Sequence, residues 1–257
     1  MSRDKMVAET IVGHLKSLKL PGMARAFRER ARQAREEGLS YEEYLLGLLE
    51  EEMRQRSVNV ARQRRAEAHF PIERTLDQFD FTSQPQLDKD LIVRLSRCDW
   101  VKAAEPILLA GPVGTGKTHH AIALGIEAAQ RRHRVRFYRA DDLVRELTEA
   151  RSQHEVGKIR KRIDRVEVLI VDELGFVPFE RAGAELLFNL LVGRYQRRAT
   201  VITTNLPFSS WNEVFGDDRM TAALLDRLGE NAHVLTTSGS SHRTRGRLAT
   251  DEDSGGD

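Results

Sequence analysis

The chain has 257 residues, of which 40% are hydrophobic and 31% are charged, and its formal net charge is +2. This length and hydrophobic content favour one large domain with or without a small appended one, and a net charge so close to zero does not by itself indicate a nucleic-acid partner. The single cysteine, Cys98, excludes an intramolecular disulfide and a cysteine-rich zinc site.

No apolar run approaches the roughly 20 residues that a membrane-spanning helix needs. The N-terminal residues 1–5 are not followed by the apolar core of a signal peptide. We therefore expect no membrane partner and a cytoplasmic location.

Residues 7–69 are rich in strong helix formers and contain few prolines, which predicts a small all-helical module. Pro21-Gly22 and Gly38-Leu39-Ser40 divide this module into three helices or more. Ser40 and Glu43 have the spacing of a capping box at the start of the third helix. We expect the apolar face of that helix to pack inward, with Tyr44, Leu45, Leu48, Leu49 and Met53.

Four arginines of the second helix share one face because they are three or four residues apart: Arg25, Arg28, Arg32 and Arg35. Such a stripe can bind the phosphates of a nucleic acid, and further arginines between residues 54 and 65 extend the basic character. Glutamates on the same helices equally support an ordinary solvated surface. Both interpretations stay open.

The pattern changes after His69. Phe70-Pro71 ends the helical run, residues 79–81 are predicted to be extended, and residues 87–100 return to a helical pattern. We therefore predict a helical domain for DNA or partner binding over residues 1–70 and a second domain over residues 71–247. Residues 248–257 are acidic and rich in glycine, which predicts a disordered tail.

The second domain contains a complete Gly-x4-Gly-Lys-Ser/Thr pattern, formed by Gly111, Pro112, Val113, Gly114, Thr115, Gly116, Lys117 and Thr118. Its glycines let backbone N–H groups approach a triphosphate, while Lys117 reaches the β- and γ-phosphates and the Thr118 hydroxyl ligates Mg2+. An apolar strand precedes this phosphate loop and a helical pattern follows it, so that the helix N-terminus faces the anion. The loop predicts a site for a nucleoside triphosphate with Mg2+.

Two later strands end in polar residues. Val168–Val171 lead into Asp172 and Glu173, and Thr200–Thr204 lead into Asn205. In a parallel α/β sheet these ends lie beside the phosphate loop. Asp172 then holds Mg2+ directly or through water, Glu173 orients and helps deprotonate the attacking water, and Asn205 contacts the γ-phosphate or that water. The alternatives are a solvated acidic pair and ordinary turn chemistry at Asn-Leu-Pro.

Four motifs, in this order and spacing, resemble those of the AAA+ ATPases of the initiator and helicase-loader clade: residues 111–118, 168–173, 203–205 and 224–228. Residues 15–23 and 40–45 resemble, more narrowly, the IstB-type helper ATPases that bacterial insertion sequences encode. The resemblance covers nearly the whole chain, to about residue 247. It implies an α/β fold in which an AAA+ P-loop domain, with a central parallel sheet flanked by helices, follows the small helical domain.

The resemblance also implies roles for three residues. Asn205 corresponds to the sensor-1 residue, and Arg227 matches the arginine finger that one subunit offers to its neighbour's ATP. Arg243 matches the sensor-2 arginine, which contacts the nucleotide of its own subunit. The implied cofactors are ATP and Mg2+.

The function implied by the resemblance is that of an ATP-dependent transposition helper. ATP-bound subunits assemble into a homo-oligomer on duplex DNA with low sequence specificity, deform the DNA, and recruit or activate a cognate transposase, and hydrolysis resets the assembly. A DnaC-like replicative helicase loader is the alternative with the same motifs. A P-loop kinase would have little use for a basic helical module, and a scaffold without hydrolysis would not need Glu173.

Overall fold

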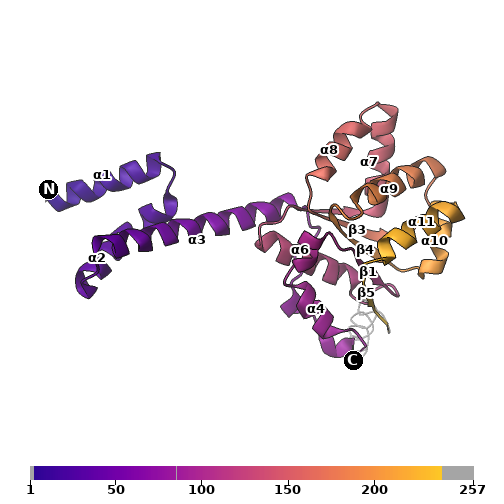
Figure 1. Cartoon of the computed structure of the whole chain (residues 1–257), viewed down its shortest axis with the longest axis horizontal. Helices are drawn as coiled ribbons and strands as arrows, with labels where there is room; N and C mark the ends of the chain where they lie inside the picture. The colour runs from indigo at the N-terminus through magenta and orange to yellow at the C-terminus, as the bar shows by residue number, and fades with distance from the viewer. Residues whose placement is uncertain (1–2, 85, 239–257) are drawn as a thin grey trace, which may run out of the picture. The chain divides into compact units, whose positions relative to one another are not determined.

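The computed structural model describes residues 3–84 and 86–238 (Figure 1). The chain folds as two compact units, one up to Gln63 and one from Arg64 onward. The division falls within helix α3 (Tyr41–Glu67), and the junction expected near residue 70 stays a prediction. The tail expected over residues 248–257 lies outside the described residues.

Residues 3–63 form the three helices that the sequence predicts, namely α1 (Arg3–Ser17), α2 (Pro21–Glu37) and the first part of α3. Pro21 occupies the first position of α2, where no intrahelical partner for its missing N–H is required. The predicted capping box is present at the start of α3. The Glu43 N–H donates to Ser40 Oγ at 3.2 Å, and the Ser40 N–H donates to Glu43 Oε2 at 2.8 Å.

A small apolar core around Leu15, Met23 and Leu48 holds the first unit together. Beside it lies a buried carboxylate, that of Glu52, which accepts the N–H groups of Gly22 and Met23 at 2.7 and 3.2 Å. These N–H groups open α2 and have no partner within their own helix, so the carboxylate on α3 caps α2. No local sequence pattern marks this contact.

The apolar face of α3 is only partly buried. Leu48 is 4% exposed, but the exposed fractions of Leu45, Leu49 and Met53 are 50%, 45% and 69%. The expectation that these three side chains pack inward is wrong. The buried positions Leu48 and Glu52 are four residues apart, which shows that the rest of the unit covers only one narrow stripe of the helix.

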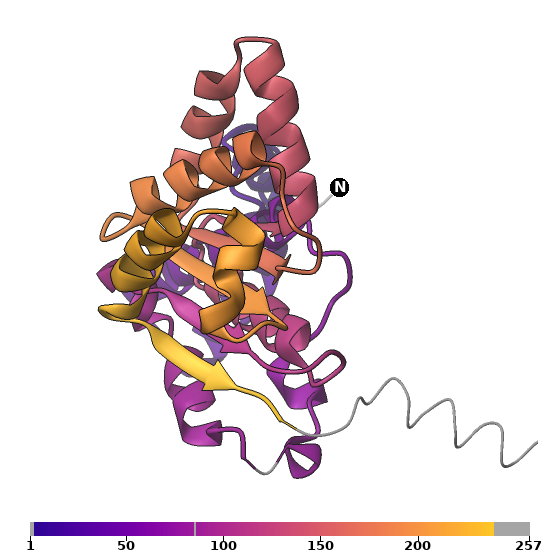
Figure 2. The ribbon, with the colours of Figure 1, turned by 90° about the vertical axis from the view of Figure 1, so that its right-hand side faces the viewer.

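Within residues 64–84 and 86–238 the second unit contains a five-stranded parallel sheet in the order β2-β3-β4-β1-β5. Figure 2 shows β5, drawn in yellow, at one edge of this sheet. The strands are β1 (Ile107–Ala110), β2 (Val135–Arg139), β3 (Val168–Leu174), β4 (Ala199–Thr204) and β5 (His233–Thr236). The predicted α/β architecture with a parallel sheet is confirmed.

Helices cover both faces of the sheet (Figure 2). On one face lie α4 (Lys89–Leu95), α5 (Asp99–Ala103) and α6 (Lys117–Gln130). On the other lie α7 (Ala140–Ser152), α9 (Arg181–Arg194), α10 (Trp211–Phe215) and α11 (Asp218–Gly229), with α8 (Val156–Asp164) packed on α7 and the short 3-10 turn η3 (Phe208–Ser210) before α10. Both faces of the strands are therefore buried: Ile107 and Leu109 belong to the core on the α6 side, and Leu108 belongs to the other. Among the described residues, none of the helices combines the length and apolarity needed to cross a bilayer.

The segment between α3 and α4 has extended backbone angles at residues 79 and 80, as the sequence predicts, but not at residue 81. It forms two short 3-10 turns, η1 (Leu76–Gln78) and η2 (Phe81–Ser83). The second turn starts where the Asp80 carboxylate accepts the Thr82 N–H at 2.9 Å. Phe79, between the turns, packs edge-on against His120 of α6, with ring centroids 4.1 Å apart. The segment is thereby held against the start of α6.

Candidate functional site

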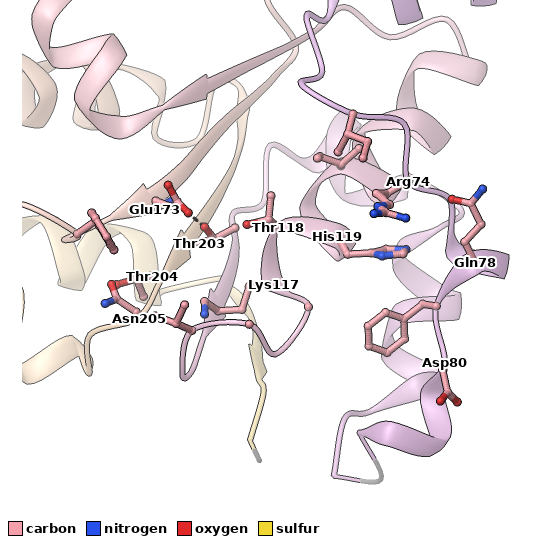
Figure 3. A pocket seen from close by; sticks show the side chains of 17 residues that line it. Arg74, Gln78, Asp80, Lys117, Thr118, His119, Glu173, Thr203, Thr204 and Asn205 are labelled. Atoms are coloured by element: carbon pink, nitrogen blue, oxygen red, sulfur yellow. Dashed lines mark hydrogen bonds between the residues drawn. The ribbon is translucent and has the colours of Figure 1, made fainter. Parts of the chain in front are cut away.

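A cavity of about 520 Å3 lies where the phosphate loop meets the ends of β3 and β4. Figure 3 shows Lys117 and Thr118 in its centre, with Glu173, Thr203 and Asn205 on one side. On the other side lie Arg74, Gln78 and Asp80 of the segment before α4. His119, the residue of α6 that follows Thr118, lies there too. Motifs that are far apart in the sequence thus meet at the carboxyl edge of the sheet, where α/β proteins bind their ligands.

The phosphate loop joins β1 to α6 through glycines in left-handed or otherwise positive-φ conformations. Gly116, with φ of 95°, lies directly before the helix, and Lys117 is the first residue within it. Lys117 Nζ donates to the carbonyl oxygen of Pro112 at 2.6 Å, so its side chain folds back over the loop. Because α6 begins at the cavity, the N–H groups of its first turn and its dipole favour an anion there.

The predicted loop residues that line the cavity are Val113, Gly114, Gly116, Lys117 and Thr118. Gly111, Pro112 and Thr115 do not line it, and their predicted contact with nucleotide stays a prediction. Thr115 is instead buried, and its hydroxyl lies 2.6 Å from the hydroxyl of Thr237, just after β5. This hydrogen bond connects the loop to the end of β5. Thr237 belongs to none of the sequence motifs, because it lies 122 residues after Thr115 in the chain.

Asp172 is buried near the end of β3 and accepts three hydrogen bonds from two hydroxyl groups. Thr118 Oγ1 donates to its two carboxylate oxygens at 2.9 and 3.2 Å, and Thr203 Oγ1 donates to Oδ1 at 2.6 Å. Burial raises the pKa of Asp172 and the charge of Glu173 adds to this, whereas the two hydroxyls oppose it. The adjoining oxygen donors of Thr118 and Asp172 are the ligand type that Mg2+ prefers, so the predicted metal fits these residues.

Glu173 is half-buried and faces the cavity (Figure 3). Its φ is 60°, an unusual value for a residue with a side chain. Its N–H donates to Thr203 Oγ1 at 2.9 Å, and Arg139 Nε lies 4.0 Å from its carboxylate. Sequence analysis missed both of these partners. The available signals were the position of Thr203 two residues before Asn205 and that of Arg139 at the end of a strand, where it pairs with Asp172 in the sheet register.

The wall opposite Glu173 is formed by residues that carry no motif. His119 Nε2 donates to the carbonyl oxygen of Thr75 at 2.8 Å, which ties the segment before α4 to the phosphate-binding helix. The ring of Phe79 packs edge-on against His119, with centroids 5.2 Å apart.

The predicted finger and sensor residues are distributed differently. Asn205 lines the cavity directly after β4. Arg227 lies half-buried on α11 and is not among the residues that line the cavity. Arg243 lies outside the described residues. The structure therefore brings Lys117, Thr118 and Glu173 together with Asn205, and leaves Arg227 apart from them.

Two groups of exposed basic side chains are not among the residues that line the cavity. The predicted arginines of α2 are all exposed: Arg25, Arg28, Arg32 and Arg35. Arg32 is the member that forms ion pairs, with Glu29 and Glu36. The second group, on α8, was missed by sequence analysis although residues 158–162 form a basic run. Among the described residues, three exposed basic side chains of this group form no ion pair: Arg160, Lys161 and Arg165.

A family model described as IstB-like ATP binding protein matches residues 13–250 of the chain. The chain is 37% identical over 213 residues to an insertion sequence IS21 ATP-binding protein of Pseudomonas aeruginosa, covering 83% of this chain and 80% of that protein. It is 33% identical over 244 residues to an insertion sequence IS5376 ATP-binding protein of Geobacillus stearothermophilus, covering 95% and 97%.

Solved structures resemble the chain in fold. AMPPCP-bound DnaA from Aquifex aeolicus has a TM-score of 0.56 and 21% identity, and the match covers 71% of this chain and 55% of that one. DnaI has a TM-score of 0.55 and 20% identity, with 65% and 92% covered. The chain thus spans about half the length of the DnaA chain that it matches. At these identities the likeness concerns the fold, and it agrees with the predicted AAA+ P-loop domain.

Replacement of Gly116 by alanine tests the loop geometry. A Cβ atom at this position would lie 2.6 Å from Phe79 Cε2, on a backbone whose φ of 95° disfavours a side chain. Because clash and strain each act on the loop, we expect the affinity for ATP to fall about tenfold or more. Displacement of a fluorescent nucleotide measures this affinity.

Gly157→Ala on α8 is the matched control, since a Cβ atom there meets nothing within 4 Å, and it should bind ATP as the unchanged protein does. Unchanged ATP affinity in Gly116→Ala would contradict the loop conformation described above.

Proposed function

Since the chain belongs to the family of IstB-like ATP-binding proteins, whose model matches residues 13–250, we propose that it is an ATPase that assists the transposition of an insertion sequence. Family membership confirms the resemblance that the sequence motifs carried. The observation that most supports hydrolysis is that the phosphate loop, Glu173 and Asn205 line the same cavity, with Asp172 hydrogen-bonded to Thr118.

In the proposed reaction, Lys117 and the N-terminus of α6 bind the phosphates of ATP. Thr118 and Asp172 would hold Mg2+, which supplies charge neutralisation to the β- and γ-phosphates when it is bound. Glu173 orients the attacking water and accepts its proton, and Asn205 contacts the γ-phosphate or that water. Each of these side chains lines the cavity except that of Asp172, which is hydrogen-bonded to Thr118.

We further propose that subunits assemble so that Arg227 of one reaches the ATP of the next. The position of Arg227 outside the cavity of its own chain supports this role, because a finger acting within the subunit would have to line that cavity. An arginine supplied by a neighbour stabilises the charge of the transition state only in the assembled state. Arg243 is proposed to contact the nucleotide of its own subunit.

The proposed substrate of the assembly is duplex DNA, bound with low sequence specificity. Bending DNA costs several kcal/mol, and many phosphate contacts from an oligomer can offset that cost without contacts to the bases. The exposed basic residues of α2 and α8 support this proposal. The deformed DNA would then recruit or activate the cognate transposase. The expected place of action is the cytoplasm, where ATP and the DNA occur together.

A DnaC-like helicase loader is the second candidate. The observation behind this candidate is the structural similarity to DnaI, which concerns the fold alone. A stable complex with a hexameric replicative helicase would favour the loader. The insertion-sequence relatives favour the transposition helper, since two of them match most of the chain at 33–37% identity.

Two substitutions separate ATP binding from hydrolysis. Glu173→Gln keeps the phosphate loop but removes the base, so we expect it to hold an ATP-bound assembly on DNA. Lys117→Ala removes a phosphate contact and should prevent that assembly from forming. The measurement is the mass distribution with ATP, Mg2+ and a duplex of about 60 base pairs, long enough for many phosphate contacts. Assembly on DNA that is indifferent to ATP in both variants would contradict this coupling.

Removal of charge identifies the surface that contacts DNA. One variant replaces the four α2 arginines, Arg25, Arg28, Arg32 and Arg35, with glutamine, and the other replaces Arg160, Lys161 and Arg165. For each arginine or lysine that contacts a phosphate, the slope of log affinity against log salt should fall by about one. We expect at least one variant to show this loss in titrations of labelled duplex at several salt concentrations.

The affinity for ATP without DNA is the internal control and should be unchanged in both variants. Wild-type salt slopes in both would contradict DNA binding at these surfaces.

A further inference from the structure

The hydroxyl of Thr203 lies between the two acidic residues of the site. Thr203 belongs to β4, two residues before Asn205 in the sequence. It is 1% exposed and lines the cavity. Its Oγ1 donates to Asp172 Oδ1 at 2.6 Å and accepts the N–H of Glu173 at 2.9 Å, a contact drawn as a dashed line in Figure 3. One side chain therefore holds two consecutive residues of the neighbouring strand.

The chemistry of the three groups fixes the direction of these bonds. A hydroxyl carries one proton and can accept from another donor at the same time. The buried Asp172 carboxylate accepts a hydrogen bond from the hydroxyl group. The amide N–H of Glu173 can only donate a hydrogen bond, and the hydroxyl oxygen accepts it. Replacement of the hydroxyl by a methyl group would remove both bonds and leave the amide N–H without this acceptor.

The bond to Glu173 lies at an irregularity in the sheet. Val171 pairs with Ile202, and the next paired residues are Leu174 and Thr204. Three steps on β3 thus match two steps on β4, which leaves one extra residue on β3. Bulges of this kind redirect a side chain and leave an N–H outside the ladder. Here the Thr203 hydroxyl supplies the acceptor, and Glu173 adopts its positive φ of 60°.

We propose that Thr203 is a positioning residue for ATP hydrolysis. It holds the backbone of Glu173 in the conformation that faces the carboxylate to the cavity, and it orients the Asp172 carboxylate that Thr118 also binds. Thr118, Asp172, Thr203 and Glu173 form one continuous chain of hydrogen bonds, so the proposed metal ligands and the proposed base move together. The inference rests on the proposed ATPase function, and Thr203 itself is not assigned a contact with the substrate.

Thr203→Val tests this inference because it keeps the size of the side chain and removes the hydroxyl. Misplacement of a catalytic group by about 1 Å is sufficient for a large loss, and we expect kcat to fall about 10- to 100-fold. KM for ATP should change less than about threefold, since neither bond of Thr203 reaches the phosphate loop backbone. Thr203→Ser restores the hydroxyl and should bring kcat back to within about threefold of the unchanged protein.

Thr200→Val is the matched control. Thr200 lies on the same strand, is buried, and its hydroxyl accepts a hydrogen bond from Arg194 Nε at 3.2 Å, but it does not line the cavity. The control should keep kcat within about twofold although it also loses a buried hydrogen bond. Equilibrium binding of the non-hydrolysable analogue AMPPCP should be the same in all four proteins. Thermal unfolding checks that each is folded, and Thr203→Ala replaces the valine variant if that variant does not fold.

The inference is overturned if the valine variant hydrolyses ATP at the unchanged rate, if serine fails to restore the rate, or if the loss appears in AMPPCP affinity rather than in kcat. Failure of the proposed function has a different signature. The unchanged protein would then release phosphate no faster than Lys117→Ala, which would overturn the ATPase proposal together with this inference.

Discussion

A carboxylate buried near the end of a strand inside the sheet must have partners, and the site is organised around those of Asp172 on β3. The hydroxyls of Thr118 and Thr203 reach it from α6 and β4, so three elements are joined at one point. Leaving such a carboxylate unpaired would cost several kcal/mol or force it to bind a proton. The same arrangement presents oxygen donors for a divalent cation, which links the stability of the sheet edge to its proposed chemistry.

The strand order determines which motifs can meet. Because β1 lies between β4 and β5, the phosphate loop has Asn205 on one side and Thr237 on the other. Because β3 is the next strand beyond β4, Glu173 lies one strand further from the loop and its backbone is held by the β4 side chain of Thr203. The proposed phosphate-binding and water-activating residues thus follow different strands, β1 and β3, with β4 between them.

The sequence was informative where function depends on neighbouring residues. The phosphate loop is a contiguous motif, and strands that end in acids are visible as apolar runs, so Lys117, Thr118, Asp172 and Glu173 could all be placed at one edge of the sheet. Thr203, Thr237 and the His119 contact with Thr75 depend on residues 30 to 122 positions apart, and no local pattern predicts them. On α3, helical periodicity identified the apolar residues, but only the packing of the unit shows that Leu45, Leu49 and Met53 are left exposed.

The central claim is that ATP is hydrolysed in this cavity and that hydrolysis requires neighbouring subunits on DNA. The most direct test is phosphate release by the unchanged protein at saturating ATP, Mg2+ and duplex DNA, measured over a wide range of protein concentration. We predict a rate per subunit that rises with concentration and then levels off, because the arginine finger is supplied only by a neighbouring subunit. A rate per subunit that is the same at every concentration, or no phosphate release at all, would contradict it.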